Sequence, residues 1–167
     1  IIAEQVSEDE QARNTVRFAF SRQAVITAKV VKGKETEADK YRDYFEFSKP
    51  LKKCTSHQLL AIRRAEAEGL LKVSISPDDE ECVERLERRF VRSNNACGEQ
   101  VAEAVQDAYK RLLKSSIETE FAAQSKEQAD EEAIRVFVQN LRQLLLASPL
   151  GQKRVMGIDP GFRTGCK

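Results

Sequence analysis

A single carboxylate close to the last residue is the side chain best placed to do chemistry. Asp159 follows the apolar run 155–158 and precedes Pro160 and Gly161. A carboxylate at the end of a strand can hold a divalent cation, and a glycine turn lets a phosphate come close. Metal-assisted hydrolysis needs further carboxylates, and none follows before Lys167. Taken alone, Asp159 is the acid of an Asp-Pro-Gly turn, and we predict no metal site from this stretch.

A second candidate site is a row of arginines at helical spacing, namely Arg85, Arg88, Arg89 and Arg92. One basic helix face of this kind could bind phosphates. Acidic residues interleave with the arginines and give i,i+4 pairs such as Glu81 with Arg85. Helix faces of mixed sign are usually solvated and paired. We therefore expect a paired surface, with nucleic-acid binding as the alternative.

A zinc site is the third possibility. Cys54 and His57 have the spacing of metal ligands, but a structural zinc needs four, which would recruit Cys82 and Cys97. None of the four cysteines forms a CxxC pair, and disulfide frameworks belong to small secreted chains. We expect reduced thiols, His57 at the first turn of a helix, and neither metal nor cofactor.

The composition narrows the functional classes. The 167 residues carry 33% charged and 7% aromatic residues, no Trp and a net charge of +1. Such a chain lacks the global basic field of a dedicated nucleic-acid binder. There is no signal peptide, and no apolar run approaches a membrane span, so we expect a cytoplasmic protein. The chain begins with Ile1 and its one methionine is Met156, so we expect an internal piece of a longer polypeptide.

The spacing of apolar residues predicts a mainly helical fold, a multi-helix array. Helices are expected over 9–30, 56–68, about 77–91 and 97–113. Ser56 and Ser76 are the expected N-caps of the second and third, and Gly69 is the expected C′ residue of the second. The aromatic segment 41–47 predicts a short helix or turn.

The longest expected element is a helix near 115–147. Ser115 and Glu118 fit a capping box at its start. Apolar residues occupy both ends, around 117–121 and 134–145, and the middle is polar and rich in alanine. Such a rod would measure roughly 50 Å at the usual helical rise. Burial at both ends is typical of a helix that bridges two packed units.

One or two short strands are expected beside the helices. Leu71, Val73 and Ile75 alternate with polar residues over 70–76, which predicts a half-buried strand. Its partner would be a small hairpin or a part outside this chain. A second strand is predicted at 154–158, held loosely or paired with 70–76 or a neighbouring chain. Residues 1–150 would then be the helical region, and 151–167 a linker and the first strand of another domain.

Eight stretches in this order and spacing resemble the bacterial Tex family of transcription accessory proteins. They are KYRDYF at 40–45, SH at 56–57, LAIRR at 60–64, DAYKRLL at 107–113, IE at 117–118, ADEEAI at 129–134, NLRQLLLA at 140–147 and GIDPGFRTGCK at 157–167. The resemblance covers nearly the whole chain and is most specific in its second half.

This resemblance implies a large cytoplasmic parent in which a helical region precedes a YqgF-type ribonuclease-H-like domain, helix-hairpin-helix units and an RNA-binding barrel. Residues 1–150 would be the later part of the helical region, and 151–167 the start of the truncated YqgF-type domain. Asp159 matches the first acid of that domain's motif. Nucleic-acid binding in the family is associated chiefly with modules that this chain lacks.

Three functions are therefore open. The first is a non-catalytic helical scaffold that positions RNA- or DNA-binding domains outside this chain. The second is part of a metal-dependent nuclease whose first acid is Asp159. The third is a protein-docking module for the transcription machinery. The expected partners are nucleic acid, RNA or DNA, reached through the full-length parent, and the transcription machinery, but no membrane.

Overall fold

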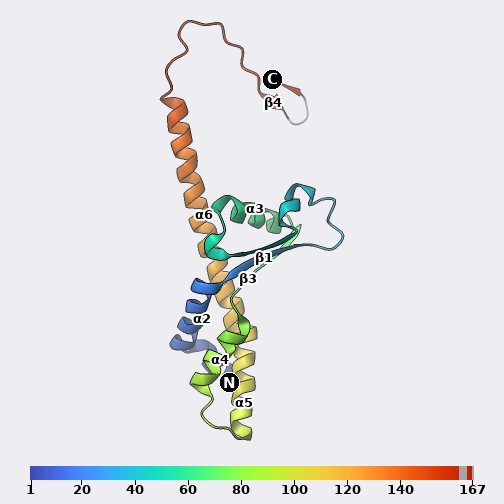
Figure 1. The fold of residues 1–167 in the computed structure, drawn as a ribbon, viewed down its shortest axis with the longest axis vertical. Coiled ribbons are helices and arrows are strands. Elements are labelled where there is room, and N and C mark those ends of the chain that lie inside the picture. The colour runs from blue at the N-terminus through green and yellow to red at the C-terminus, as the bar shows by residue number, and fades with distance from the viewer. Residues whose placement is uncertain (162–164, 167) are drawn as a thin grey trace. The chain divides into compact units, whose positions relative to one another are not determined.

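The computed structural model describes residues 1–161 and 165–166. The chain divides into two compact units, Ile1–Ile134 and Arg135–Lys167 (Figure 1). The described residues hold six α-helices, short 3-10 and π-helical segments, and five strands. The mainly helical class is confirmed, with more strand than the sequence led us to expect.

The first unit begins with helices and encloses a small sheet. Its elements in order are α1 (Ile2–Glu8), α2 (Glu10–Gln23), β1 (Val25–Val30), η1 (Asp39–Tyr44), β2 (Glu46–Pro50), η2 (Leu51–Lys53), α3 (Ser56–Ala67), β3 (Leu71–Ser76), α4 (Asp79–Phe90), α5 (Ala96–Asp107) and η3 (Ala108–Leu113). The helix α6 (Lys114–Leu145) starts in this unit and ends in the second.

The three strands form an antiparallel sheet in the order β2-β1-β3. Ile26 of β1 lies opposite Lys49 of β2 and Ile75 of β3. The helix predicted over 9–30 is therefore wrong beyond Gln23. Residues 25–27 are all β-branched and fit a pleated surface. Pairing with two distant strands satisfies their backbone groups, and the predicted strand at 70–76 is confirmed with β1 as its partner.

The aromatic segment 41–47 divides between two elements. Its first part lies in the 3-10 helix η1, as predicted, but Phe47 belongs to β2, which the sequence did not predict. Phe47 is half-buried, whereas Glu46 and Ser48 on either side are exposed. This alternation is the signature of a strand with one face on the core.

Helices α3 and α4 lie where predicted but begin at different caps. Thr55, rather than Ser56, caps α3, and its N–H donates to the Gln58 side chain at 3.4 Å. Asp78, rather than Ser76, accepts two backbone N–H groups at the start of α4. Ser76 is still the last residue of β3, so its backbone cannot begin the helix. Each helix thus starts at the extended residue directly before its first turn.

The last helices of the first unit follow one another without a break. Asp107, Ala108 and Lys114, which bound the π-helical segment η3, all have right-handed helical φ and ψ. The predicted long helix is confirmed as α6. The capping box predicted at Ser115 is wrong because no helix starts there, and Glu118 makes a different contact, described below.

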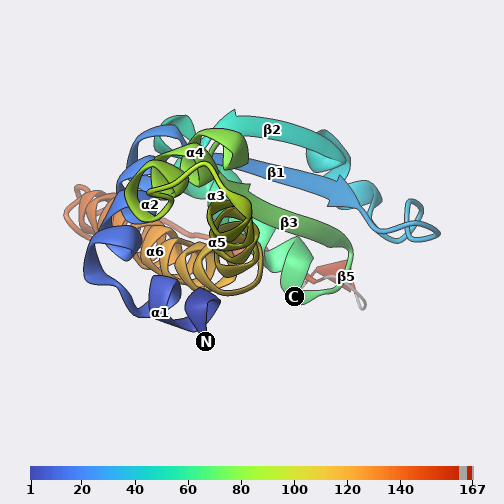
Figure 2. The ribbon, with the colours of Figure 1, turned by 90° about the horizontal axis from the view of Figure 1, so that it is seen from below.

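One part of the core of the first unit lies among the helices α1, α2, α4, α5 and the η3 segment, and another part lies against one face of the sheet. Ile26 and Ala28 of β1 and Ile75 of β3 are fully or almost fully buried on this face, which α3 covers. Figure 2 shows α3 behind the strands and the opposite face of the sheet open toward the viewer. A sheet with one covered and one open face explains why apolar and polar residues alternate along its strands.

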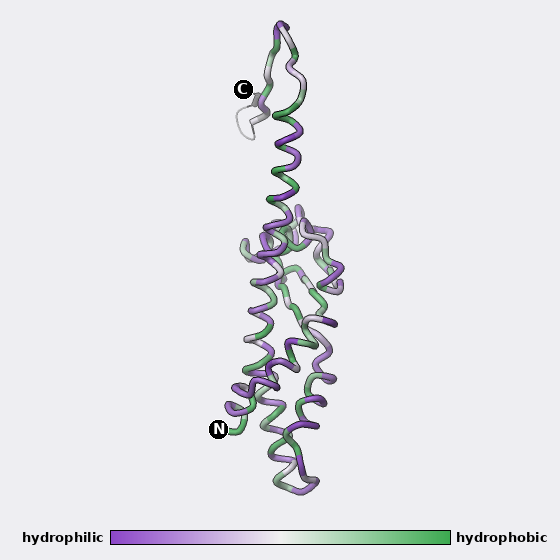
Figure 3. The backbone as a smooth tube through the Cα atoms, turned by 90° about the vertical axis from the view of Figure 1, so that its left-hand side faces the viewer, coloured by the Kyte–Doolittle hydropathy of each residue, from purple (hydrophilic) through white to green (hydrophobic). Residues whose placement is uncertain are grey.

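The second unit is made of the last turns of α6, residues 146–159 without helix or strand, and the two-residue strands β4 (Pro160–Gly161) and β5 (Gly165–Cys166). The strand predicted at 154–158 is not formed. The expected burial at this end of the helix is also wrong, since Leu144 and Leu145 are 74% and 75% exposed. Figure 3 shows apolar residues recurring through these turns. The described part of this unit has no second layer to cover them.

Candidate functional site at the start of the long helix

The residues proposed as metal ligands are not brought together. Asp159 is exposed in the second unit. In the first unit Cys54 is half-buried, Cys82 is buried in α4, and Cys97 is exposed in α5. His57 lies on α3, with a ring nitrogen 3.4 Å from the Thr55 hydroxyl. Within residues 1–161 and 165–166 no three His, Cys, Asp or Glu side chains could hold a metal ion, which rules out the four-ligand arrangement there.

The arginine row on α4 is largely neutralised. Arg85 pairs with Glu81, and Arg88 pairs with Glu84 at 3.2 Å. Arg89 reaches Asp9 at the N-terminus of α2, also at 3.2 Å. The pKa of Asp9 is lowered, first by the Ala12 backbone N–H that it caps and then by Arg89. Arg92 is exposed beyond the end of the helix.

A polar cluster that the sequence analysis did not predict connects α4 to the long helix α6 by hydrogen bonds and an ion pair. The Tyr109 hydroxyl donates to Asp79 Oδ1 at 2.6 Å, and the Ser76 hydroxyl donates to the same oxygen at 2.9 Å. Lys114 Nζ lies 2.5 Å from the other carboxylate oxygen. Tyr109 is fully buried within the π-helical segment. One carboxylate thus joins the end of β3, the start of α4 and the start of α6.

The cluster controls the ionisation of its members. Burial would raise the pKa of Asp79, but the hydrogen bonds from Lys114, Tyr109 and Ser76 outweigh it and hold that pKa below its ordinary value. Burial, and then the bond to the Asp79 carboxylate, raises the pKa of Tyr109 far above its ordinary value. At neutral pH the pair is therefore a neutral phenol that donates to a carboxylate, a charge-assisted hydrogen bond.

A second contact closes the free edge of the sheet against the same helix. Glu118 Oε1 of α6 accepts the backbone N–H of Ile75 at 2.7 Å. Ile75 belongs to the edge strand β3, whose outward N–H would otherwise need water. Two residues before Glu118, Ser116 accepts a hydrogen bond from Arg13, and two residues after it, Glu120 pairs with Arg17 at 3.0 Å. We call Ser76, Asp79, Tyr109, Lys114 and Glu118, together with the Ile75 N–H, the mount of α6.

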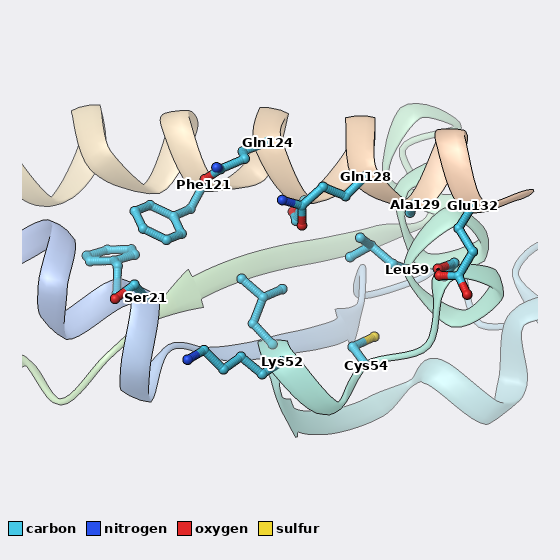
Figure 4. Close-up of a pocket in the computed structure, with 13 residues that line it drawn as sticks. Ser21, Lys52, Cys54, Leu59, Phe121, Gln124, Gln128, Ala129 and Glu132 are labelled. Atoms are coloured by element: carbon cyan, nitrogen blue, oxygen red, sulfur yellow. The ribbon is translucent and has the colours of Figure 1, made fainter.

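A cleft of about 330 Å³ lies beside α6 in the first unit (Figure 4). Phe121, Leu59 and Ala129 contribute its apolar surface, with the Phe121 ring 5.4 Å from that of Phe20. Polar groups surround it, and the Ser56 hydroxyl at the start of α3 donates to Glu132 of α6. Burial raises the pKa of the Cys54 thiol in this cleft, which disfavours the nucleophilic thiolate.

Comparison with known proteins settles the family. The model of the Tex central region-like family matches residues 1–137. This chain belongs to the Tex central region-like family. It is 37% identical over its whole length to the transcriptional accessory protein Tex of Neisseria gonorrhoeae and 37% identical to protein YhgF of Escherichia coli, and it covers 23% of each. It is 33% identical to the human S1 RNA-binding domain-containing protein 1, of which it covers 18%.

The chain spans less than a quarter of each of these relatives. The family model matches residues 1–137, and all residues of the mount lie within that range. A search of the described residues finds no helix with the length and apolar character to cross a membrane.

Proposed function

We propose that this chain is a non-catalytic helical scaffold of a cytoplasmic, nucleic-acid-binding transcription accessory protein, and that it positions RNA- or DNA-binding domains outside these residues. The observation that carries the proposal is the mount. Each of its polar groups bonds to another element of the first unit, so together they hold a helix in place. A group that turns over a substrate needs a side chain free to reach it.

The second part of α6 supports the same role. Beyond Ile134, which is itself 62% exposed, the helix carries exposed leucines and valines on successive turns. Exposed apolar residues in such number mark an interaction surface. We assign this surface to packing against a further domain of a Tex-like protein. The human relative is named for an S1 RNA-binding domain. That name supports RNA as the ligand of the further domain.

A chimera tests this proposal. The chain replaces the matching segment of Neisseria gonorrhoeae Tex, and Ala133, an exposed residue within α6, is changed to Pro or to Ser. Pro breaks an α-helix at a cost of about 3 kcal/mol, whereas Ser leaves it intact. We expect the Ala133→Pro chimera to differ from the Ala133→Ser chimera in X-ray scattering radius and to bind RNA more weakly. Identical scattering and RNA affinity of the two chimeras would exclude a positioning role.

A further inference from the structure

The uncovered face of the sheet carries side chains that no packing contact explains. Figure 2 shows this face, opposite α3, along β2, β1 and β3. The strand registers place six polar side chains on it in two rows. One row is Glu46, Lys29 and Lys72, and the next is Ser48, Thr27 and Ser74. Every member is exposed or half-buried.

The first row contains a like-charge pair. Lys29 of β1 and Lys72 of β3 lie directly opposite each other in the antiparallel register. Two like charges in this position repel and destabilise a sheet. Among the described residues neither lysine makes an ion pair, and Glu46, on the other side of Lys29, makes none either. An anion bound between the two ammonium groups would remove the repulsion.

The second row supplies hydroxyl groups beside the two lysines. The Thr27 hydroxyl donates to the Ser74 carbonyl at 3.4 Å. In the part of the chain that the structure describes, the hydroxyls of Ser48 and Ser74 have no hydrogen-bond partner. Lysine ammonium groups and serine hydroxyls are the side chains that typically contact phosphate oxygens in nucleic acids. None of these six side chains is aromatic, so none of them offers a ring on which a base could stack.

We propose that this open sheet face binds the phosphodiester backbone of nucleic acid, without sequence preference, through Lys29, Lys72 and the hydroxyls of Ser48 and Ser74. The site lies on the sheet of the first unit and does not depend on the positioning role of α6. Two phosphate contacts give weak binding that salt abolishes, because the affinity arises from the release of counterions. Arg85, Arg88 and Arg89 of α4 are already paired with acids and are not part of this site.

The test measures the salt dependence of binding. Fluorescence anisotropy follows a labelled oligothymidylate of about 15 nucleotides, or a duplex of the same length, titrated with the chain between about 25 and 200 mM KCl. The Lys29→Gln/Lys72→Gln double variant is compared with Lys53→Gln/Lys110→Gln, which removes two exposed lysines elsewhere. Circular dichroism confirms that both remain folded.

Each phosphate contact to a single strand contributes about 0.7 to the slope of log affinity against log salt. We expect the Lys29/Lys72 variant to lose about 1.4 from that slope for the single strand, and the Lys53/Lys110 variant to keep it. Equal loss in the two variants, or no binding at the lowest salt, would overturn the site. Displacement of the oligonucleotide by polyglutamate as efficiently as by unlabelled oligonucleotide would show a docking face for acidic protein and overturn it too.

Discussion

The hydroxyl of Tyr109, buried in the π-helical turn before α6, lies 2.6 Å from Asp79 at the start of α4. The two residues are 30 positions apart and belong to different helices. Their bond fixes the start of the long helix to the end of the sheet, because Ser76 binds the same carboxylate oxygen. A buried hydrogen bond to a charged group is among the stronger polar contacts in proteins.

Removing the Tyr109 hydroxyl is expected to destabilise the first unit. Tyr109→Phe keeps the ring but leaves Asp79 without its buried donor. Hydrogen bonds to charged groups contribute about 1.5 to 3 kcal/mol, so the free energy of unfolding should fall by about that amount. Tyr44→Phe is the control, because the Tyr44 hydroxyl has no hydrogen-bond partner among the described residues. Urea unfolding of the two variants decides the matter, and equal stability would show that the bond contributes nothing.

The stability contributed by Asp79 should depend on pH in the acid range. Its pKa is lowered in the folded chain because three hydrogen bonds outweigh the cost of burial. A carboxyl with a lowered folded pKa stabilises the fold above its unfolded pKa, about 3.9, and the contribution disappears as pH falls through the folded value. The difference in Tm between wild type and Asp79→Asn should therefore be constant from about pH 7 to 5 and shrink below about pH 4.

The control for this measurement is Glu80→Gln, which removes an exposed acid from the same first turn of α4. The Tm difference between Glu80→Gln and wild type reports only the interaction of an acid with the helix dipole. That interaction typically contributes less than about 1 kcal/mol to the free energy of unfolding at an exposed site. If the Asp79→Asn difference kept its size down to about pH 2, the lowered pKa of Asp79 would be refuted.

The contact between Glu118 and the Ile75 N–H should be visible in amide exchange. Glu118→Gln retains an acceptor but removes the charge, so the bond to the edge strand weakens. We expect faster hydrogen exchange at the Ile75 amide and a loss of about 1 kcal/mol in stability. Glu127→Gln, on an exposed turn of the same helix, should change neither. If the exchange rate at Ile75 were unchanged in Glu118→Gln, the charged carboxylate would not protect this N–H any better than water does.

Removing the charge repulsion between Lys29 and Lys72 should raise the free energy of unfolding of the chain. Lys72→Gln removes one of two like charges that lie directly opposite on β1 and β3. Cross-strand pairs contribute roughly 0.2 to 1 kcal/mol, and we expect a gain within that range at low salt that fades as salt screens the charges. Thermal unfolding in about 20 and 500 mM KCl measures it. A loss of stability at low salt would show that Lys72 makes a favourable contact instead.

Local pattern was sufficient for the helices α2 to α6 and for β3, but it missed α1 (Ile2–Glu8), β1 and β2. The alternation of Leu71, Val73 and Ile75 is a period-two signal that requires no knowledge of the partner strand. Residues 25–30 directly continue a helical pattern, and only pairing with β2 and β3, distant in sequence, makes them a strand. Tertiary contacts of this kind override local propensity.

The mount was beyond sequence reasoning for the same physical reason. Ser115 and Glu118 have the spacing of a capping box, but that motif acts only where a helix begins. The chain is already helical from Ala96, so Glu118 is left to bind Ile75. Asp79 looks like an ordinary first-turn acid, and nothing in its neighbourhood points to Tyr109. The one sequence signal is Tyr109 itself, a tyrosine at a position whose helical spacing places it on the buried face, where its hydroxyl needs a partner.

The exposed apolar turns of α6 should contribute little to the stability of this chain. Leu144 and Leu145 are about three-quarters exposed, so their replacement by Gln removes almost no buried surface, and the unfolding free energy should change by no more than about 0.5 kcal/mol. Leu113→Ala, at a fully buried position in the same run of helix, should cost about 2 to 5 kcal/mol. In the Neisseria gonorrhoeae chimera the Leu144→Gln/Leu145→Gln change should become costly, because there the proposed neighbouring domain covers these residues. An equally small effect in chain and chimera would mean that this surface is not a domain contact.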